Sequence, residues 1–386
     1  MNRKDYEGHL RDLVYMLPST YEGNTKTVRD SISKTVPKEI MKNIERIFIT
    51  GCGDSFHAAH ASLPAFKELS GIDRSKISAP RCIELSRNIP LPKENADKTL
   101  VIGISATGGS LRTAETLTRA KSRGCVTMSL TSRPESRNAK SADYTFIVGT
   151  KDSTDSPGLN SYYCSLYALY VIAALIGEAK GVKEEGTVDI IIEKIKEYTY
   201  SYEPILDKID EDMFELAKVW KDYRGYEAVG DGIGYASAWF VGAKLVECAG
   251  MIAPAVDSEQ WCHVNTFAHT PENIGTIFQG KKGDANMSRL GETVNHAVGI
   301  GRPVLFISDG TKEDFGIKVD AIIYRIPSPP EGYDFLMPLM DYVPGSLLTS
   351  YIAAMNNKVY FRRDDERRAE VYKNAVEKPM VVLDNF

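Results

Sequence analysis

TLVIGISATGGS, residues 99–110, combines the two features that decide the fold of this chain. Its first half, residues 99–104, is an unbroken apolar run, which is typical of a strand buried on both faces of a parallel sheet. Its second half passes at once into small hydroxyl and glycine residues, and a helix-forming pattern follows over 111–122. This order of strand, glycine-containing turn and helix predicts an α/β unit.

The same order recurs in both halves of the chain. Residues 46–50 form one such run before Gly51 and Gly53, and residues 226–230 form another before a turn at 232–234. We expect further strands at 125–130, 143–148, 274–278, 303–307 and 321–324, and further helices at 162–176, through Lys244, and at 347–355. The recurrence predicts a duplicated, doubly wound α/β fold with mostly parallel sheets.

Charge patterning marks the expected domain boundaries. Lys and Glu repeat at helical spacing over 182–224, which indicates solvated helices between two halves. We therefore expect an N-terminal helical extension, a first domain, a helical linker, a second domain and a C-terminal tail, at residues 1–35, 36–181, 182–224, 225–358 and 359–386.

Composition excludes several classes of protein. With 43% apolar and 26% charged residues over 386 positions, the chain is an ordinary globular sequence, and its net charge of −5 excludes an electrostatic footprint for nucleic acid or an anionic membrane. The longest weakly charged stretch, 233–256, contains two ionisable residues and Pro254, so we expect a buried helix there and no membrane span. A polar N-terminus and six cysteines without CxxC spacing indicate reduced thiols and a cytoplasmic protein.

Three loops of the first half carry hydroxyl groups where anions bind in open parallel sheets, beyond the carboxyl ends of the strands. The strongest is the turn at 105–110, because its glycines let backbone N–H groups approach an anion at the start of a helix. The turn at 51–55 and the pair Asn160 and Ser161 supply further polar groups. A phosphate ester is the predicted guest. The alternative is that these Ser and Thr side chains only cap helices.

Two nucleotide interpretations are disfavoured. The turn at 105–110 lacks the GxxxxGK[ST] pattern and its lysine, so ATP chemistry is not expected. Gly51 and Gly53 resemble the start of a GxGxxG motif, but Phe56 stands at the third glycine and no acidic residue follows at the end of an obvious next strand.

The second half contributes a different signal. Lys244 and Glu247 are three residues apart in an otherwise uncharged helix, which places them on one helical face. A polar loop at 257–263 then delivers His263. Lysine, glutamate and histidine in one cavity would supply a cation, a base and a proton carrier that titrates near neutrality. A purely structural ion pair is the alternative.

Other candidates carry less weight. His57 and His60 are three residues apart on the first helix, a spacing that could bind metal, but no acidic or cysteine partner is evident and we expect no metal site. Cys52 follows a predicted strand and Cys262 precedes His263, so each could be mistaken for a nucleophile. Cysteines that are buried or have no catalytic role are commoner.

The motifs resemble those of the double sugar isomerase (SIS) domain family, over about residues 36–358. GCGDSFHA at 51–58 is similar to the family's CGTSxHA, GISATGGS at 103–110 to its GISQSGET phosphate loop, and KLVE at 244–247 to its KLKE. The sixteen-residue interval from Glu247 to His263 matches the family's spacing from catalytic glutamate to ring-opening histidine. The relatives named by this resemblance are the isomerase half of glucosamine-6-phosphate synthase, fructosamine-phosphate deglycases and phosphosugar isomerases.

The resemblance implies a fold, a site and an activity. The fold is two tandem flavodoxin-like SIS subdomains. Glu247 would shuttle a proton between C1 and C2 through an enediol or enamine, Lys244 would stabilise or form an imine, and His263 would assist ring opening. The phosphate would be held by Ser55, Ser105, Thr107 and Ser110, with Gly53, Ala106 and Ser161 lining the substrate. No cofactor is implied. The histidine of the relatives crosses from a neighbouring subunit, so a homodimer or a dimer of dimers with shared active sites is expected.

Departures from the family pattern leave the substrate open. Ala106 stands where the family often has a glutamine that touches the sugar, and Gly109 stands where it has Glu or Asn. Asn2 follows Met1, and we expect no glutaminase activity. Lys378 lies in the neighbourhood of the synthase's C-terminal lysine without a secure match. We predict an isomerase, deaminase or deglycase of a 6-phosphorylated ketose, amino sugar or fructosamine. The alternative is a non-catalytic sugar-phosphate-binding regulator.

Overall fold

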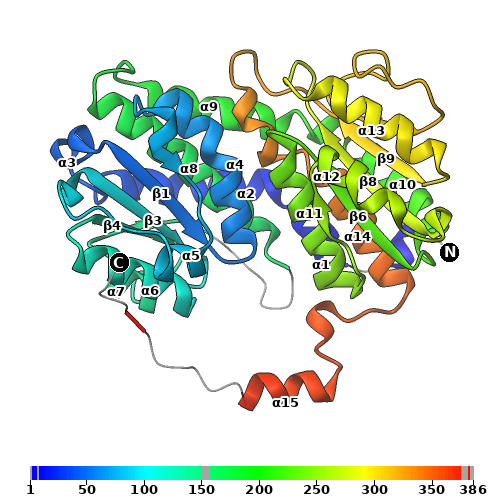
Figure 1. The fold of residues 1–386 in the computed structure, drawn as a ribbon, viewed down its shortest axis with the longest axis horizontal. Helices are drawn as coiled ribbons and strands as arrows, with labels where there is room; N and C mark the ends of the chain where they lie inside the picture. Colours follow the sequence, from blue (N-terminus) through cyan, green and yellow to red (C-terminus); the bar gives the residue numbers. More distant parts are fainter. Residues whose placement is uncertain (1, 7, 150–156, 375–380, 383–386) are drawn as a thin grey trace. The chain divides into compact units, whose positions relative to one another are not determined.

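The computed structural model describes residues 2–6, 8–149, 157–374 and 381–382 (Figure 1). Its internal contacts divide the chain into two compact units. Of the described residues, 17–149, 160–196 and 381–382 belong to the unit that we call the N-terminal unit, and 2–6, 8–16, 157–159 and 197–374 belong to the C-terminal unit. Helices α8 (Leu159–Ala179) and α9 (Thr187–Tyr200), which we assign to the N-terminal unit, therefore each cross the division at one end. The division falls within the expected helical extension, so that residues before and after Met16 belong to different units.

The N-terminal unit contains a five-stranded parallel sheet in the order β2-β1-β3-β4-β5. The strands are β1 (Arg46–Gly51), β2 (Ile77–Ser78), β3 (Thr99–Ile104), β4 (Val126–Thr131) and β5 (Tyr144–Ile147). Every residue of β3 is buried, as its unbroken apolar run predicts. The helices are α2 (Leu17–Ile32), α3 (Lys38–Asn43), α4 (Asp54–Leu69), α5 (Cys82–Arg87), α6 (Leu111–Ser122), α7 (Arg137–Lys140), α8 (Leu159–Ala179) and α9 (Thr187–Tyr200).

The C-terminal unit repeats this topology. Its parallel sheet has the order β10-β9-β8-β6-β7. Read from β7, the strands follow the order second, first, third, fourth and fifth along the chain, as they do in the N-terminal unit. The strands are β6 (Gly225–Gly230), β7 (Ala255–Val256), β8 (Ile274–Gly280), β9 (Val304–Ser308) and β10 (Ile322–Arg325). The helices are α1 (His9–Tyr15), α10 (Glu203–Trp220), α11 (Gly234–Ala249), α12 (Ser258–His263), α13 (Met287–Gly299), α14 (Val343–Met355) and α15 (Glu366–Asn374). The predicted duplicated doubly wound fold is therefore confirmed.

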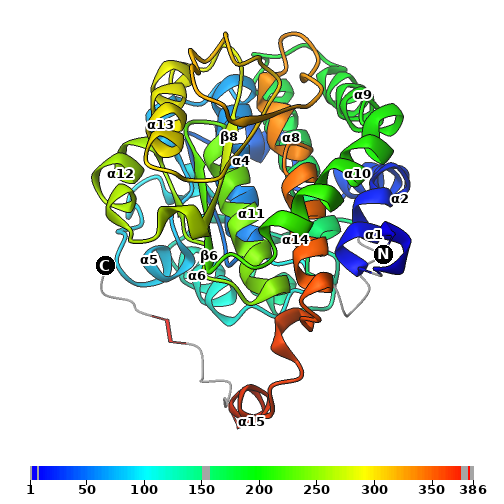
Figure 2. The ribbon, with the colours of Figure 1, turned by 90° about the vertical axis from the view of Figure 1, so that its right-hand side faces the viewer.

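Helices cover the second sheet in two layers (Figure 2). On one face, Trp261 of α12 and apolar residues of α13 pack on Val229, Phe278 and Phe306 of the strands. In the other layer α11 packs on β6 and α14, and α14 packs on α10. Helix α10 buries an apolar face despite its many charges, because Leu206, Ile209, Met213 and Phe214 recur at helical spacing.

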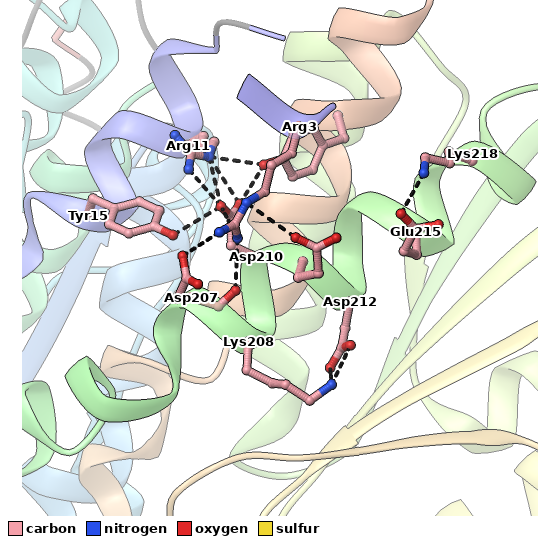
Figure 3. Close-up of polar contacts among 11 residues, drawn as sticks. Arg3, Arg11, Tyr15, Asp207, Lys208, Asp210, Asp212, Glu215 and Lys218 are labelled. Carbon is pink, nitrogen blue, oxygen red and sulfur yellow. Dashed lines mark hydrogen bonds and ion pairs between the residues drawn. The ribbon is translucent and has the colours of Figure 1, made fainter. Parts of the chain in front are cut away.

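A buried carboxylate ties the N-terminal residues to α10 (Figure 3). Asp210 has no exposed surface, and it accepts hydrogen bonds from Arg11 (2.7 Å), Arg3 (3.1 Å), Tyr15 (3.0 Å) and Tyr351 (2.7 Å). Burial alone would raise the pKa of Asp210, but these hydrogen bonds and the Arg11 charge lower it overall below its ordinary value of 3.8.

Several elements differ from expectation. The short edge strands β2 and β7 and the helices α5 and α13 were not predicted. The segment expected as a polar loop at 257–263 is mostly the helix α12, because the Asp257 side chain caps it by accepting a hydrogen bond from Gln260 N. One helix of the described chain, α8, is long and apolar enough to cross a membrane, and 89% of its most apolar window is buried, as in the core helix of a soluble protein.

Candidate functional site

The N-terminal unit carries one candidate site, the turn at 105–110 together with the turn at 51–55. Gly51, the last residue of β1, pairs with Ile104, the last residue of β3, so both turns leave the same edge of the sheet at neighbouring positions. The two turns touch, since Ser110 Oγ donates to Cys52 Sγ at 3.5 Å. The structure therefore brings together two of the three hydroxyl-bearing loops predicted from the sequence.

The turn at 105–110, which we call the phosphate loop, is fixed from several sides. Gly108 N donates to Ser105 O at 2.9 Å, and Ala106 O accepts from Ser132 N at 3.0 Å. With its amide oriented to donate, Asn138 Nδ2 reaches Gly108 O and Ser110 O, each at 2.9 Å. Gly108 has φ +66°, and a Cβ there would lie 2.1 Å from the Ser136 side chain, so only glycine fits.

The hydroxyl groups of the phosphate loop differ in exposure. Ser105 is buried, and its Oγ lies 3.5 Å from Ser110 N, whereas Thr107 is exposed. Ser110 is the N-cap of α6 and accepts from Thr113 N, so the capping role weighed from the sequence is present as well. An anion at this turn would meet hydroxyl groups and the positive end of the α6 dipole.

The turn at 51–55 leads into α4 through a second glycine with a positive φ angle. Gly53 precedes the helix with φ +56°, and Phe56 N and His57 N both donate to Gly53 O. Ser55 lies in the first turn of α4 and is half-buried. The Asp54 carboxylate lies 3.6 Å from His57 Nδ1. Among the residues that the structure describes, no group of three or more metal-ligating side chains is present.

The third predicted loop enters α8. Ser161 and Asn160 are buried in the first turn of this helix. Both amide atoms of Asn160 are buried without a hydrogen-bond partner within the described part of the chain. Residues 150–156 of the loop and Lys378 lie outside the described residues.

The C-terminal unit contributes a candidate feature of its own, an ion pair on α11. Lys244 Nζ donates to Glu247 Oε2 at 2.6 Å, so the two side chains lie on one helical face as their spacing predicts, and they form the ion pair that was the structural alternative. Lys244 has no exposed surface, whereas 29% of the Glu247 side chain is exposed. The Lys244 ammonium also lies 4.6 Å from the centre of the Phe240 ring. The carboxylate therefore presents one side outward and rests on a buried cation.

His263 ends the helix α12. Its side chain is 71% exposed, and its Nε2 lies 2.9 Å from Glu259 Oε1 one helical turn earlier. Arg289 Nε donates to the other oxygen of Glu259 at 2.7 Å. Glu259 thus bridges the imidazole and a guanidinium, a contact that its four-residue spacing from His263 could have suggested.

A buried network beneath α12 was missed in the sequence. Trp261 Nε1 donates to Glu227 Oε2 at 2.7 Å, and Asn265 Nδ2 donates to Glu227 Oε1 at 3.1 Å. Arg302, which is buried, lies 3.4 Å from Glu227 and donates to Asn265 O at 2.8 Å. These contacts hold the second half of α12 and the residues that follow it against the sheet. A glutamate inside the apolar run at 226–230 was the available signal.

Positive groups lie beside the phosphate loop as well. Arg137 Nη1 lies 3.5 Å from Gly109 O, and Arg112 pairs with Glu115 in the first turns of α6. Glu115 is buried and also pairs with Arg87 at 3.3 Å. None of these three arginines was predicted as a site residue, because arginine positions outside a motif carry no distinguishing pattern.

Comparison with known proteins gives a consistent result. The SIS domain family model matches residues 40–175. The glutamine–fructose-6-phosphate aminotransferase [isomerizing] of Caldanaerobacter subterraneus is 26% identical over 330 residues, which cover 86% of this chain and 52% of that protein. The chain spans about half the length of the curated relatives it matches.

Solved structures share the fold. The C-terminal domain of glucosamine-fructose-6-phosphate aminotransferase from Francisella tularensis superposes with a TM-score of 0.78 at 18% identity, covering 93% of this chain and 99% of that one. Glucosamine-6-phosphate deaminase from Thermotoga maritima superposes with a TM-score of 0.65 at 17% identity, covering 91% and 94%. The resemblance seen in the motifs is confirmed: the chain contains an SIS domain and is homologous to the isomerase domain of glucosamine-fructose-6-phosphate aminotransferase, and solved structures of phosphosugar isomerases share its fold.

Proposed function

We propose that this protein is a cofactor-free enzyme that acts on a 6-phosphorylated ketose, amino sugar or fructosamine, as an isomerase, deaminase or deglycase. Support comes from the SIS family match, from the fold shared with glucosamine-6-phosphate deaminase and with the C-terminal domain of glucosamine-fructose-6-phosphate aminotransferase, and, separately, from the phosphate loop and from the Lys244–Glu247 pair. All three reactions begin with removal of a proton from the carbon next to a carbonyl or imine.

The observation that carries the proposal is the Lys244–Glu247 pair. A general base needs a carboxylate with one accessible side, and Glu247 has it. The Lys244 ammonium has no exposed surface, so its interaction with a developing oxyanion or imine nitrogen is weakly screened by water. A surface ion pair would lack the second property, because water screens an exposed lysine.

In the proposed step, Glu247 takes a proton from C1 or C2 of the open-chain sugar and the electron pair moves into an enediol or enamine. Lys244 stabilises the negative charge on the carbonyl oxygen; alternatively, before the proton is taken, its neutral amine adds to the carbonyl carbon and water leaves, which gives an imine at the carbonyl carbon. Glu247 then returns the proton to the neighbouring carbon. His263 opens the sugar ring by moving a proton to the ring oxygen.

The phosphate end of the substrate is assigned to the N-terminal unit. In this proposal Ser55, Ser105, Thr107 and Ser110 donate hydrogen bonds to the phosphate oxygens, and Gly53, Ala106 and Ser161 line the sugar. A small residue at Ala106 leaves room for a bulkier substituent than the glutamine of the family motif, which favours an amine-bearing substrate. We also propose a homodimer in the cytoplasm that shares its active sites, with His263 acting in the neighbouring subunit.

The test incubates the full chain in deuterated water with fructose 6-phosphate, glucosamine 6-phosphate and a phosphorylated fructosamine, and follows the C1 and C2 protons by NMR. The proposal predicts deuterium incorporation with at least one of the three sugars. Ser105→Ala should raise the substrate concentration needed for half-maximal exchange, whereas Ser33→Ala, an exposed serine of the same unit, should leave it unchanged. Calorimetric binding of a sugar phosphate without exchange of either proton would instead identify a non-catalytic regulator.

A further inference from the structure

Two cysteines lie at the edge of the phosphate loop. Cys52 stands between Gly51 and Gly53 in the turn after β1 and is exposed, and its Sγ accepts a hydrogen bond from Ser110 Oγ at 3.5 Å. Cys82 is the first residue of α5 and is 2% exposed. Thr113 and Ser110 link the two thiol side chains through hydrogen bonds, although thirty residues separate the cysteines in the sequence.

Hydroxyl groups surround both sulfur atoms. Thr50 Oγ1, at the end of β1, donates to Pro80 O at 2.7 Å and to Cys82 Sγ at 3.3 Å. Thr113 Oγ1 lies 3.5 Å from Cys82 Sγ and donates to Ser110 Oγ at 2.9 Å. Ser110 therefore links Thr113 to Cys52, and the two sulfurs share one polar cluster built from β1, α5 and α6. Such a cluster solvates a thiolate, and it brings the second thiol within reach of the first.

The same cluster makes the two cysteines unequal. The hydrogen bond from Cys82 lowers the pKa of Cys52 to about 6, with further help from Ser110, Thr113 and the Arg112 charge and against the effect of burial. The pKa of Cys82 is raised, because Cys52 holds the negative charge and because the site is buried. Burial raises the pKa of Cys125, elsewhere in the unit, to about 11. At pH 7 Cys52 is the reactive thiolate, and Cys82 keeps its proton.

We propose that Cys52 and Cys82 are an oxidisable thiol pair, in which a hydroperoxide modifies Cys52 and Cys82 resolves the product to a disulfide. This modification site is independent of the sugar chemistry proposed above.

The reaction balances in two steps. The Cys52 sulfur attacks one oxygen of hydrogen peroxide, the O–O bond breaks, and the departing hydroxide is protonated to water, which leaves Cys52 as a sulfenic acid. The Cys82 sulfur then attacks the Cys52 sulfur, the S–O bond breaks, and the departing hydroxide takes the Cys82 proton. Two thiols and one peroxide thus give one disulfide and two waters.

The disulfide has a consequence for the neighbouring loop. It joins the turn at 51–55 to α5 and withdraws the Cys52 sulfur from Ser110, which is its hydrogen-bond donor. A consequence for substrate rests on the proposed function: the oxidised protein should bind a sugar phosphate about tenfold more weakly, a loss of ~1.4 kcal/mol.

The test treats the full chain with hydrogen peroxide, blocks free thiols with N-ethylmaleimide, digests with trypsin and identifies the peptides by mass spectrometry. Trypsin releases Cys52 within residues 47–67 and Cys82 within residues 82–87. The expected product is these two peptides joined by a disulfide. In Cys82→Ser, Cys52 should stop at the sulfenic acid and be trapped by dimedone. Cys262→Ser, which alters a half-buried cysteine outside the cluster, should form the Cys52–Cys82 disulfide as the unaltered protein does.

A second measurement uses the unaltered protein, so that it does not depend on a variant that fails to fold. Iodoacetamide alkylation of Cys52 in the untreated protein should be half-maximal near pH 6 and at least tenfold faster at pH 7 than that of Cys262. Alkylation of Cys52 no faster than that of Cys262, or peroxide treatment that joins no peptides of residues 47–67 and 82–87, would overturn the proposal. A sugar phosphate bound at the phosphate loop should slow the alkylation of Cys52 by iodoacetamide. If neither fructose 6-phosphate nor the other sugars slow it while peroxide still forms the disulfide, the result counts against the proposed function and supports the thiol pair.

Discussion

Helices α10 and α11 carry the same three kinds of side chain and use them differently. In α10, Lys218 pairs with Glu215 and lies 4.3 Å from the Phe214 ring; in α11, Lys244 pairs with Glu247 and lies 4.6 Å from the Phe240 ring. The α10 side chains are 42% and 56% exposed, whereas Lys244 has no exposed surface and Glu247 is 29% exposed. The two clusters contain the same types of side chain, and they differ in how far the lysine is buried.

That difference decides what each pair can do. Water and salt screen the α10 pair, so it contributes little to stability and offers no unusual reactivity. The α11 pair holds a cation out of water beneath a partly open carboxylate, which is costly for the fold unless both charges are satisfied. The α10 pair is therefore a matched control for the α11 pair within the same unit.

The largest expected loss of stability comes from a third carboxylate, Asp210, which shares α10 with the exposed pair (Figure 3). Asp210→Ala should lower the free energy of unfolding by ~3–5 kcal/mol, because it leaves the Arg3 and Arg11 charges and two tyrosine hydroxyls without their buried acceptor. Urea unfolding followed by circular dichroism measures the change. Glu215→Ala should stay within ~0.5 kcal/mol of the unaltered protein. A loss below about 1 kcal/mol for Asp210→Ala would show that burial does not govern these pairs.

The α11 pair should show an intermediate effect. Glu247→Gln leaves the buried Lys244 ammonium with a neutral acceptor and should cost ~1–3 kcal/mol in the same unfolding experiment. The double change Lys244→Met with Glu247→Gln should cost less than Glu247→Gln alone, because it removes the buried charge. Equal costs for Glu247→Gln and Glu215→Gln would contradict the contrast between the two helices.

The contribution of the Asp210 carboxylate to the free energy of unfolding should depend on pH. The pKa of Asp210 is lowered in the folded protein, so its contribution to stability is present above its ordinary value of 3.8 and is lost as the pH falls through the lower folded value. The unaltered protein should therefore lose stability steeply below about pH 4. In Asp210→Asn that acid limb should be shallower. The free energy of unfolding measured from pH 7 to pH 2 provides the comparison.

The smallest expected effect belongs to the exposed pair. A double-mutant cycle on Glu215 and Lys218 should give a coupling energy of ~0.3–0.5 kcal/mol at low salt. In about 1 M sodium chloride, where the Debye length is roughly 3 Å, that coupling should vanish. A coupling that survived high salt would place the α10 pair in the same class as the α11 pair.

Sequence patterns predicted the strands well and the polar contacts poorly. The strands β3 and β9 lie within one residue of expectation, because a short apolar run followed at once by polar residues leaves little freedom. The Lys244–Glu247 pairing was predictable, since helical periodicity places the two side chains together. The contacts of Glu227 with Trp261 and Arg302 were not, because they join segments far apart in the sequence.

Helix α12 and Asp210 show the same limit. The segment at 257–263 has few apolar residues, and its capping aspartate was the one sign of a helix. Asp210 looks in the sequence like its charged neighbours, which face water, and only the register of α10 shows that it lies on the buried face. Residue type alone does not report burial, and burial is what distinguishes the candidate base from its exposed counterpart.

The central claim is that the Glu247 carboxylate moves the substrate proton. The most direct measurement is the rate of deuterium incorporation from solvent at C1 and C2 of the responsive sugar phosphate, for the unaltered protein, Glu247→Gln and Glu215→Gln side by side. The account predicts that Glu247→Gln slows incorporation by about 10²–10⁴-fold and that Glu215→Gln leaves it unchanged. Incorporation at an undiminished rate in folded Glu247→Gln protein would contradict it.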